Sequence, residues 1–244
     1  MLKGRTAFVT GGTGAVGSAI VRVMAREGAA VAYSYHSRPD AARRIDSELA
    51  AAGATVRSYP LDVLDGAAAE GLARTVEQEL GPVDVLVNNA GATQVMPFAM
   101  IQEADWDGVV DVNVKGMFLV TKAFARGMVR RKSGSIVNLG SLAGVRMLEV
   151  PVHYAAAKSA VVGFTLSLAR ELGRYGIRVN AIVPGLLTDG VSVQVPEKQQ
   201  QDYCRHCALG RPGRCEEVAE VVAFLASDRA SYVNAQAIRI DGGI

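Results

Sequence analysis

Three side chains in the middle of the chain could together move a proton onto a carbonyl oxygen. Tyr154 and Lys158 are four residues apart in a helical stretch, so they share one face of the expected helix. A tyrosine with a pKa of about 10 is a poor acid or base at neutral pH, but a nearby ammonium favours the phenolate and lowers that pKa. Ser141 follows an expected strand and could hold the carbonyl oxygen. Each residue alone has an ordinary structural explanation, so the prediction rests on the combination.

A glycine-rich segment near the start of the chain predicts a dinucleotide site. The residues TGGTGAVG, at 10–17, lie between an expected strand and an amphipathic helix, and Gly12, Gly14 and Gly17 fit the pattern G-x-G-x-x-G. Glycines let the backbone approach a pyrophosphate, and the helix N-terminus adds free N–H groups and a partial positive charge. Such turns also occur as plain structural turns, but this context favours nucleotide binding.

The end of the second expected strand predicts which dinucleotide is bound. An NAD site usually carries an acidic residue about 20 residues after the glycines, on the ribose 2′-hydroxyl. Here the sequence is Tyr35, His36, Ser37 and Arg38, with no carboxylate. Ser37 and Arg38 could donate hydrogen bonds to a 2′-phosphate, although Arg38 could also be an ordinary exposed charge. We therefore expect NADPH/NADP+ as the cofactor.

The elements that must position these residues alternate regularly along the chain. Expected strands cover residues 5–10, 30–35, 54–59, 83–87, 135–139, 178–183 and 236–240. Expected helices cover residues 15–27, 40–52, 67–80, 105–131, 154–174 and 216–226. Nearly continuous apolar strands separated by helices predict an α/β fold. We expect a single Rossmann-type domain over residues 1–244, with a doubly wound, parallel, seven-stranded sheet and helices on both faces.

One segment breaks this alternation. Residues 185–213 contain no clear strand, many polar residues, and the prolines Pro196 and Pro212. A long excursion after a strand is usually functional, and we expect a substrate lid at about 186–213. The lid includes Cys204 and Cys207, but no second cluster supplies further ligands, so no metal site is predicted.

Composition excludes several classes of protein. Of 244 residues, 50% are hydrophobic and 20% are charged, which excludes a disordered chain. A net charge of +2 gives no reason to expect nucleic acid or an acidic membrane surface as partner. No apolar run is long enough for a transmembrane helix, and three cysteines imply no disulfide framework. A cytoplasmic location is expected.

Together these motifs resemble the short-chain dehydrogenase/reductase family over essentially the whole chain. The family pattern T-G-x-x-x-G-x-G fits Thr10, Gly11 and Gly17, with Ala15 at the middle glycine. The pattern N-N-A-G occurs at residues 88–91, and Ser141 precedes Tyr154-x-x-x-Lys158.

The resemblance implies hydride transfer between nicotinamide C4 and a carbonyl or carbinol carbon. It implies that Tyr154 transfers the proton, Ser141 positions the carbonyl, and Lys158 lowers the tyrosine pKa and binds the nicotinamide ribose. Asn113 would hold a water that relays protons through Lys158. The implied catalytic set is therefore Asn113, Ser141, Tyr154 and Lys158.

The resemblance and the motifs also imply a set of cofactor contacts. Asp62 and Val63 match a segment that touches adenine, and Pro184, Gly185 and Thr188 match a loop that contacts nicotinamide. The full expected set is Gly11, Thr13, Gly14, Ala15, Val16, Gly17, Tyr35, His36, Ser37, Arg38, Asp62, Val63, Asn89, Ala90, Gly91, Tyr154, Lys158, Pro184, Gly185 and Thr188.

Within the family, the chain resembles 3-oxoacyl-acyl-carrier-protein reductases and polyketide ketoreductases. This implies NADPH-dependent reduction of a 3-oxoacyl thioester, bound to acyl carrier protein or CoA, to the 3-hydroxyacyl form. An acidic carrier protein could meet Arg130, Arg131 and Lys132, with Arg170 and Arg174 nearby, but Arg131 and Lys132 could equally cap a helix.

The long helices at 105–131 and 154–174 carry apolar residues on more than one face, and with the resemblance this predicts a homotetramer. Two alternatives remain open for the activity. One is an NAD(P)-dependent alcohol or sugar dehydrogenase of the same family. The other is a non-enzymatic dinucleotide sensor, against which the complete catalytic set counts.

Overall fold

The computed structural model, which describes residues 1–146 and 148–244, has one sheet of seven parallel strands in the order β3-β2-β1-β4-β5-β6-β7. The strands are β1 (Thr6–Val9), β2 (Ala30–Tyr35), β3 (Val56–Pro60), β4 (Val83–Asn88), β5 (Gly134–Leu139), β6 (Ile177–Pro184) and β7 (Ala237–Ile240). The predicted doubly wound α/β fold is confirmed.

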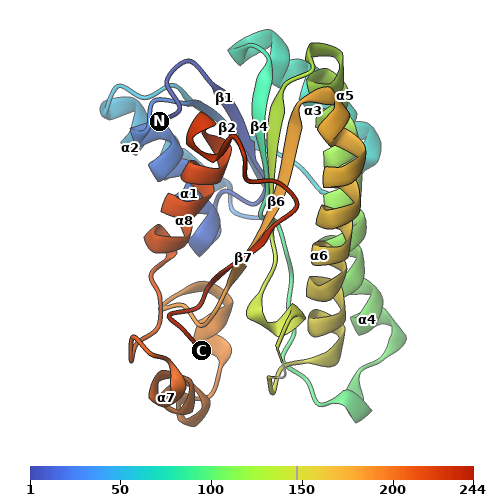
Figure 1. Cartoon of the computed structure of the whole chain (residues 1–244), viewed down its shortest axis with the longest axis vertical. Helices are drawn as coiled ribbons and strands as arrows, with labels where there is room; N and C mark the ends of the chain where they lie inside the picture. The colour runs from blue at the N-terminus through green and yellow to red at the C-terminus, as the bar shows by residue number, and fades with distance from the viewer. Residues whose placement is uncertain (147) are drawn as a thin grey trace.

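Helices cover both faces of the sheet (Figure 1). On one face lie α1 (Ala15–Arg26), α2 (Pro39–Ala51) and α8 (Cys215–Ala226), whose buried side chains share one hydrophobic cluster with the sheet. On the other lie α3 (Gly66–Leu80), α5 (Met117–Arg131) and α6 (Val152–Leu172), which share a second cluster. Strands buried on both sides explain the nearly continuous apolar runs of the sequence.

The strand order reverses at β1, which lies between β2 and β4. Chain crossovers on the two sides of this point run in opposite directions, which opens a crevice beyond the carboxyl ends of the strands. The glycine-rich turn follows β1, Asn89 follows β4, and Ser141 follows β5. The fold therefore delivers the predicted site residues to one edge of the sheet.

The single helix predicted at 105–131 is in fact three segments. These are α4 (Glu103–Val110), the π-helical η2 (Asp111–Gly116) and α5. The wider turns of a π-helix often mark functional sites, and η2 contains Asn113, whose side-chain N–H donates to the Val109 carbonyl at 2.8 Å. Apolar spacing alone did not distinguish this local change of helix type.

The predicted lid contains regular structure that the sequence did not show. The 3-10 helix η5 (Gly190–Gln194) precedes α7 (Glu197–His206), and an isolated parallel bridge joins Leu187 to Gly213. No side chain of α7 is buried, so this helix has no apolar stripe from which it could be predicted. Four further 3-10 helices in the described residues are η1 (Phe98–Met100), η3 (Leu142–Gly144), η4 (Gly173–Tyr175) and η6 (Asp228–Ala230). None of the described helices is long and apolar enough to cross a membrane.

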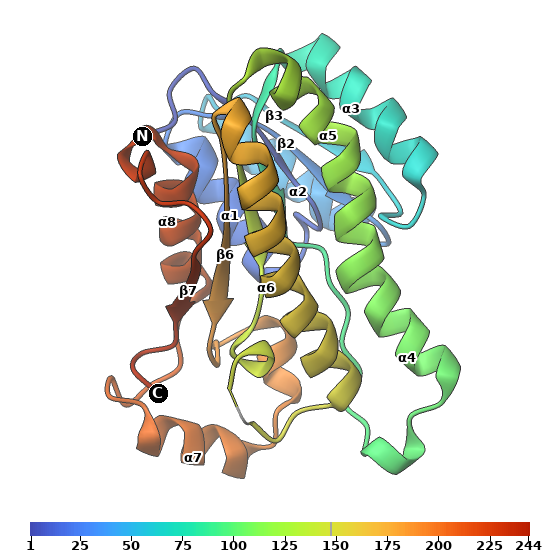
Figure 2. The ribbon, with the colours of Figure 1, turned by 45° about the vertical axis from the view of Figure 1, so that its right-hand side comes forward.

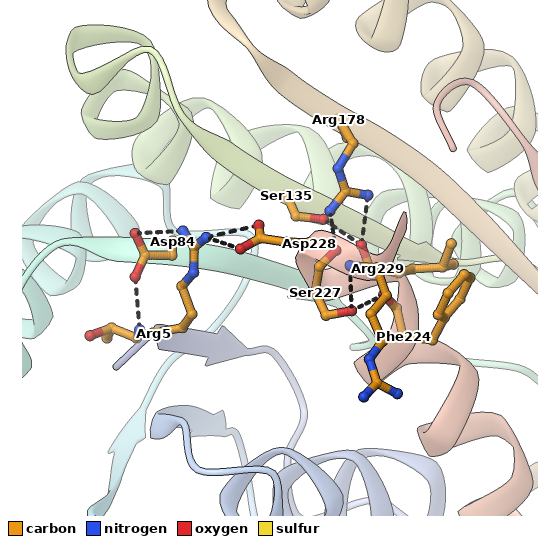
Figure 3. A network of polar contacts seen from close by, with 10 residues as sticks. Arg5, Asp84, Ser135, Arg178, Phe224, Ser227, Asp228 and Arg229 are labelled. Atoms are coloured by element: carbon orange, nitrogen blue, oxygen red, sulfur yellow. Dashed lines mark hydrogen bonds and ion pairs between the residues drawn. The ribbon is translucent and has the colours of Figure 1, made fainter. Parts of the chain in front are cut away.

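A polar network fastens the edge of the sheet opposite the crevice (Figure 3). Arg5, just before β1, donates to both carboxylate oxygens of Asp228 at 2.9 Å. Arg178 in β6 donates to the carbonyls of Leu225 and Ser227 at 2.7 and 2.9 Å. The end of α8 is thereby tied to β1 and β6, so the amino ends of the strands are held together without any residue from the crevice.

Candidate active site

A cavity of about 960 Å³ lies at the carboxyl ends of the strands, within the size range of small-molecule and cofactor sites. It brings together most of the residues that the sequence singled out. The predicted residues that line it are Gly11, Thr13, Gly14, Ala15, Val16, Gly17, His36, Ser37, Arg38, Asp62, Val63, Asn89, Ala90, Gly91, Asn113, Ser141, Tyr154, Lys158, Pro184 and Gly185.

Two predicted cofactor residues, Tyr35 and Thr188, do not line the cavity. Ser34 and His36 do, and since side chains alternate along a strand, Tyr35 points to the other face, where it packs on the core. The Thr188 N–H donates to the Gly213 carbonyl at 2.9 Å, and its side chain is exposed. The next residue, Asp189, lines the cavity instead.

The segment predicted to be a lid contributes cavity residues that no sequence motif indicated. Leu187, Asp189, Gly190, Val191 and Ser192 all line the cavity. The buried Ser192 hydroxyl accepts a hydrogen bond from the Leu187 N–H at 3.0 Å, which folds η5 back onto the loop after β6. The position of this segment after a strand could be predicted from the sequence, but which of its residues line the cavity could not.

The turn after β1 is fixed by its contacts with the end of β4. The Thr10 hydroxyl accepts hydrogen bonds from the N–H groups of Asn89 and Ala90, both at 2.9 Å. The Asn89 side chain donates back to the carbonyls of Thr10 and Gly11 at 2.9 and 3.1 Å. The predicted N-N-A-G segment therefore holds the glycine-rich turn in place.

The N-terminus of α1 faces the cavity with its N–H groups available. In α1 no side chain caps the first turn and no acidic residue lies in it. These N–H groups and the helix dipole suit a pyrophosphate. Ala15, at the position where the family pattern has a glycine, lies next to Gly190: a Cβ on Gly190 would be in van der Waals contact with the Ala15 Cβ, at 3.4 Å.

Lys158 lies buried beside Tyr154. Its ammonium donates to the Leu139 carbonyl at 2.9 Å and lies 5.7 Å from the centre of the Tyr154 ring. Burial lowers the pKa of Lys158 to about 8. Burial also raises the pKa of Tyr154, while the Ser141 side chain lowers it. The phenol is therefore protonated at neutral pH and suited to donate a proton.

Ser141 is held against the same helix by η3. Its hydroxyl accepts from the Ala143 N–H at 3.2 Å, and the Ser159 hydroxyl of α6 donates to the Gly144 carbonyl at 2.7 Å. A Cβ on Gly144 would lie 2.5 Å from the Lys158 carbonyl carbon, so only glycine permits this approach. η3 is therefore packed closely against the helix that carries Tyr154 and Lys158, and this contact positions Ser141 beside them.

The side chains of Asn113 and Lys158 both lie next to Gly91. The Asn113 side-chain N–H group donates to the carbonyls of Ala92 and Val109 at 2.7 and 2.8 Å, whereas its Oδ1 is buried without a partner among the described residues. A Cβ on Gly91 would lie 2.7 Å from Asn113 Oδ1 and 3.4 Å from Lys158 Nζ. Buried polar atoms normally have partners, so this oxygen suits an ordered water beside the ammonium.

The structure does not bring the residues predicted to meet a carrier protein to the edge of the sheet that holds the candidate site. Arg130 and Arg131 end α5 and precede β5, whereas Ser141 follows β5, so the length of the strand separates them. Arg131 donates a hydrogen bond to the Glu77 carboxylate at 3.1 Å, and the Arg130 guanidinium lies 3.8 Å from the same carboxylate. Lys132 ends α5 in a left-handed backbone conformation. Contacts of these residues with a partner stay a prediction.

Among the described residues no group of three or more metal-ligating side chains is present, and Cys204, Cys207 and Cys215 are free thiols.

Comparison with known proteins decides the family. A family model described as "Enoyl-(Acyl carrier protein) reductase" matches residues 12–244. The 3-oxoacyl-acyl-carrier-protein reductase FabG of Thermotoga maritima is 38% identical over 243 residues, which are 100% of this chain and 98% of the relative. The chain belongs to the short-chain dehydrogenase/reductase family.

Other proteins are similar over the same length. Nodulation protein G of Rhizobium sp. strain N33 is 35% identical over 243 residues, covering 100% of this chain and 98% of the relative. A short-chain dehydrogenase/reductase from Serratia marcescens has a TM-score of 0.93 at 36% identity, and levodione reductase has a TM-score of 0.93 at 34% identity. Each superposition covers 99% of this chain and 98% of the other.

The buried ammonium predicts that Lys158→Met stabilises the cofactor-free protein. Lowering the pKa from 10.5 to about 8 corresponds to roughly 3 kcal/mol at pH 7, and leaving the Leu139 carbonyl without its donor costs about 1–2 kcal/mol. We expect the free energy of unfolding to rise by about 1–2 kcal/mol at pH 7. Denaturant titrations at several pH values measure it.

The sign of the pH dependence provides a second check. Between pH 8 and 10.5 the folded wild type has lost the Lys158 proton while the unfolded chain keeps it. The destabilisation caused by burying the charged lysine therefore decreases as the pH rises through this range. The stability gap between Lys158→Met and wild type should therefore shrink over this range. A variant less stable than wild type at pH 7, or a gap that widens with pH, contradicts the explanation.

Proposed function

We propose that the protein is an NADPH-dependent carbonyl reductase that converts a 3-oxoacyl thioester, bound to acyl carrier protein or CoA, into the 3-hydroxyacyl form. The observation that carries the proposal is the convergence of Asn113, Ser141, Tyr154 and Lys158 on a cavity that also contains the glycine-rich turn. The names of the FabG relatives support the substrate class. An acyl carrier protein as partner and a cytoplasmic location belong to the same proposal.

The residues present fit a nicotinamide dinucleotide. The uncapped N-terminus of α1 would hold the pyrophosphate, and Ser37 and Arg38, which line the far end of the cavity, would hold a 2′-phosphate. Lys158 would bind the nicotinamide ribose from its buried position beside Tyr154. When bound, the reduced nicotinamide supplies a hydride to the carbonyl carbon.

The side chains of the chain supply the rest of the reaction. Ser141 donates a hydrogen bond to the carbonyl oxygen and orients it. Tyr154 transfers its phenolic proton to this oxygen as the carbon accepts the hydride, so the product is an alcohol. Lys158 stabilises the phenolate that remains, and a proton returns through Lys158 and a water held at Asn113 Oδ1.

An apolar groove between α5 and α6 supports an oligomer. A cavity of about 620 Å³ lies there, lined by Phe118, Ala125, Val129, Phe164 and Leu168 among others. Phe118 is 45% exposed although its ring is large and apolar. We propose that a second copy of the chain covers this groove and that helix pairs from two copies form a four-helix contact within a homotetramer.

Tyr154→Phe tests the proposed reaction. Removing the hydroxyl removes the proton donor but leaves the ring in place, so kcat for NADPH-dependent ketone reduction should fall at least a hundredfold. NADPH affinity, measured by fluorescence titration, should stay within about threefold of wild type, because Tyr154 is only one of many expected cofactor contacts and its ring stays in place. Tyr175→Phe, which lies outside the cavity, is the control. Retention of more than a tenth of wild-type kcat would refute the role of Tyr154.

Arg38→Ala tests the choice of cofactor. A charge-assisted hydrogen bond contributes roughly 1.5–3 kcal/mol, so the KM for NADPH should rise about tenfold or more, while the KM for NADH should hardly change. Arg43→Ala is the control, since Arg43 is exposed on α2, pairs with Asp40 and does not line the cavity. An unchanged ratio of the two KM values after Arg38→Ala would show that Arg38 does not bind the phosphate.

The oligomer is tested by light scattering. We expect a mass of about four times the 25.7 kDa of one chain at micromolar concentration. Phe118→Glu places a charge in the groove and should lower this mass, because burying an unpaired carboxylate is unfavourable. Tyr232→Glu, at a fully exposed aromatic outside the groove, should leave it unchanged. A monomeric wild type would refute the assembly.

A further inference from the structure

The side chain of Tyr33, in β2, is buried between the glycine-rich turn and α2. Its exposed fraction is 0%, and among the described residues no larger side chain is fully buried. It shares the hydrophobic cluster with Ala42 and Ile45 of α2, and Figure 2 shows α2 next to α1 and close to β2. A tyrosine buried this completely needs a partner for its hydroxyl, so the contacts of this hydroxyl are informative.

The ring of Tyr33 lies directly against Gly12. A Cβ on Gly12 would lie 2.4 Å from Tyr33 Cδ2 and 2.7 Å from its Cγ, so only glycine fits there. The next residue of β2 holds the same turn, since the Ser34 carbonyl accepts from the Gly12 N–H at 2.8 Å and the Ser34 hydroxyl accepts from the Gly11 N–H at 3.3 Å. Gly11 and Ser34 line the cavity, whereas Gly12 and Tyr33 do not. The ring therefore supports the turn from the side away from the cavity.

The hydroxyl of Tyr33 contacts α2. It lies 2.8 Å from the Ala42 carbonyl oxygen and 2.8 Å from Asp46 Oδ1, and both of these groups are acceptors. Ser58 of β3 donates to the other oxygen of Asp46 at 2.5 Å, which fixes the carboxylate. The Ala42 N–H donates in turn to the Arg38 carbonyl at 3.2 Å. Two hydrogen bonds thus connect the Tyr33 hydroxyl to the backbone of Arg38.

Few other contacts fix the beginning of α2. Among the described residues no side chain caps its N-terminus, and only three of its side chains are buried. Burial, and after it the Asp46 carboxylate, raise the pKa of the Tyr33 hydroxyl, so the hydroxyl stays protonated and remains a donor at neutral pH. The position of Arg38, which precedes the first residue of α2, therefore depends on this hydroxyl.

We propose that Tyr33 is a positioning residue for the cofactor: its ring holds the glycine-rich turn, and its hydroxyl sets the place of Arg38 relative to that turn. This rests on the proposed function, in which the turn binds the pyrophosphate and Arg38 binds the 2′-phosphate. Because one ligand carries both phosphate groups, the two protein elements that bind them must be held at a matching distance. A single buried side chain contacts one of these elements and is hydrogen-bonded to the other.

Tyr33→Phe removes the hydroxyl and keeps the ring. Dissociation constants for NADPH and NADH, which differ only in the 2′-phosphate, are measured by fluorescence titration without substrate. We expect the constant for NADPH to rise about fivefold or more and that for NADH to change less than about twofold, because charge-assisted contacts need accurate geometry. Tyr59→Phe is the matched control: the Tyr59 hydroxyl, on the neighbouring β3, donates to Glu79 at 2.7 Å outside the cavity, so neither constant should change.

Tyr33→Leu tests the ring. It removes the support behind Gly12 together with the hydroxyl, so the dissociation constant for NADH should also rise, by about threefold or more. Denaturant titration of each variant shows the conditions under which it is folded, and the cofactor titrations are made under those conditions. Unchanged NADH binding in Tyr33→Leu would reject the role of the ring.

The ratio of the two dissociation constants separates positioning from a general loss of stability, which weakens both cofactors alike. An unchanged ratio in Tyr33→Phe, or the same change of ratio in Tyr59→Phe, would overturn the proposal. A wild type that binds NADPH and NADH equally would reject it together with the choice of NADPH. The expected titrations without any reduction of a ketone would retain the role of Tyr33 and reject only the reductase.

Discussion

The hydrogen bond from the buried Lys158 ammonium to the Leu139 carbonyl is the interaction around which the catalytic edge is arranged. A cation removed from water is costly, and one carbonyl oxygen satisfies only one of its three N–H groups. The ammonium also lies 5.7 Å from the centre of the Tyr154 ring, and Gly91 lies between it and the unpartnered Oδ1 of Asn113. In the proposed reaction these two neighbours are the groups on which Lys158 acts. The N–H groups that lack a partner therefore explain both why burying the lysine destabilises the fold and why the lysine suits the proposed reaction.

Holding that ammonium in place requires a rigid support, which the core provides through a buried polar chain. Asn138, directly before Leu139, donates to the Thr165 hydroxyl of α6 at 2.9 Å and accepts from Asn88 of β4 at 2.8 Å. Asn88 also donates to the Thr121 hydroxyl of α5 at 2.8 Å. Two helices and two strands are thus fixed in register just below the site, where purely apolar packing would permit small shifts.

Sequence alone predicted the sheet and the helices on its two faces, because these depend on short-range patterns. The motifs and the family resemblance together supplied most of the residues that line the cavity, but none of those that the lid segment contributes. Apolar runs indicate the strands. The spacing of Tyr154 and Lys158, and the spacing of the glycines in the turn after β1, are imposed by local backbone geometry and can be read from the sequence. The features that were missed depend on contacts between distant segments. The π-helical turn at Asn113, the outward position of Thr188 after its bond to Gly213, and the polar helix α7 in the lid have no signature in a window of a few residues.

The network of Arg5, Arg178 and Asp228 also has a consequence for how the protein can change over time. It fastens the sheet at the edge farthest from the cavity, using the amino ends of strands and the end of α8. The lid and the connections after β4 and β5 take no part in it, so insertions or substitutions there leave the anchoring contacts intact. One end of the molecule can therefore stay nearly constant through evolution while the other end is free to acquire new substrates.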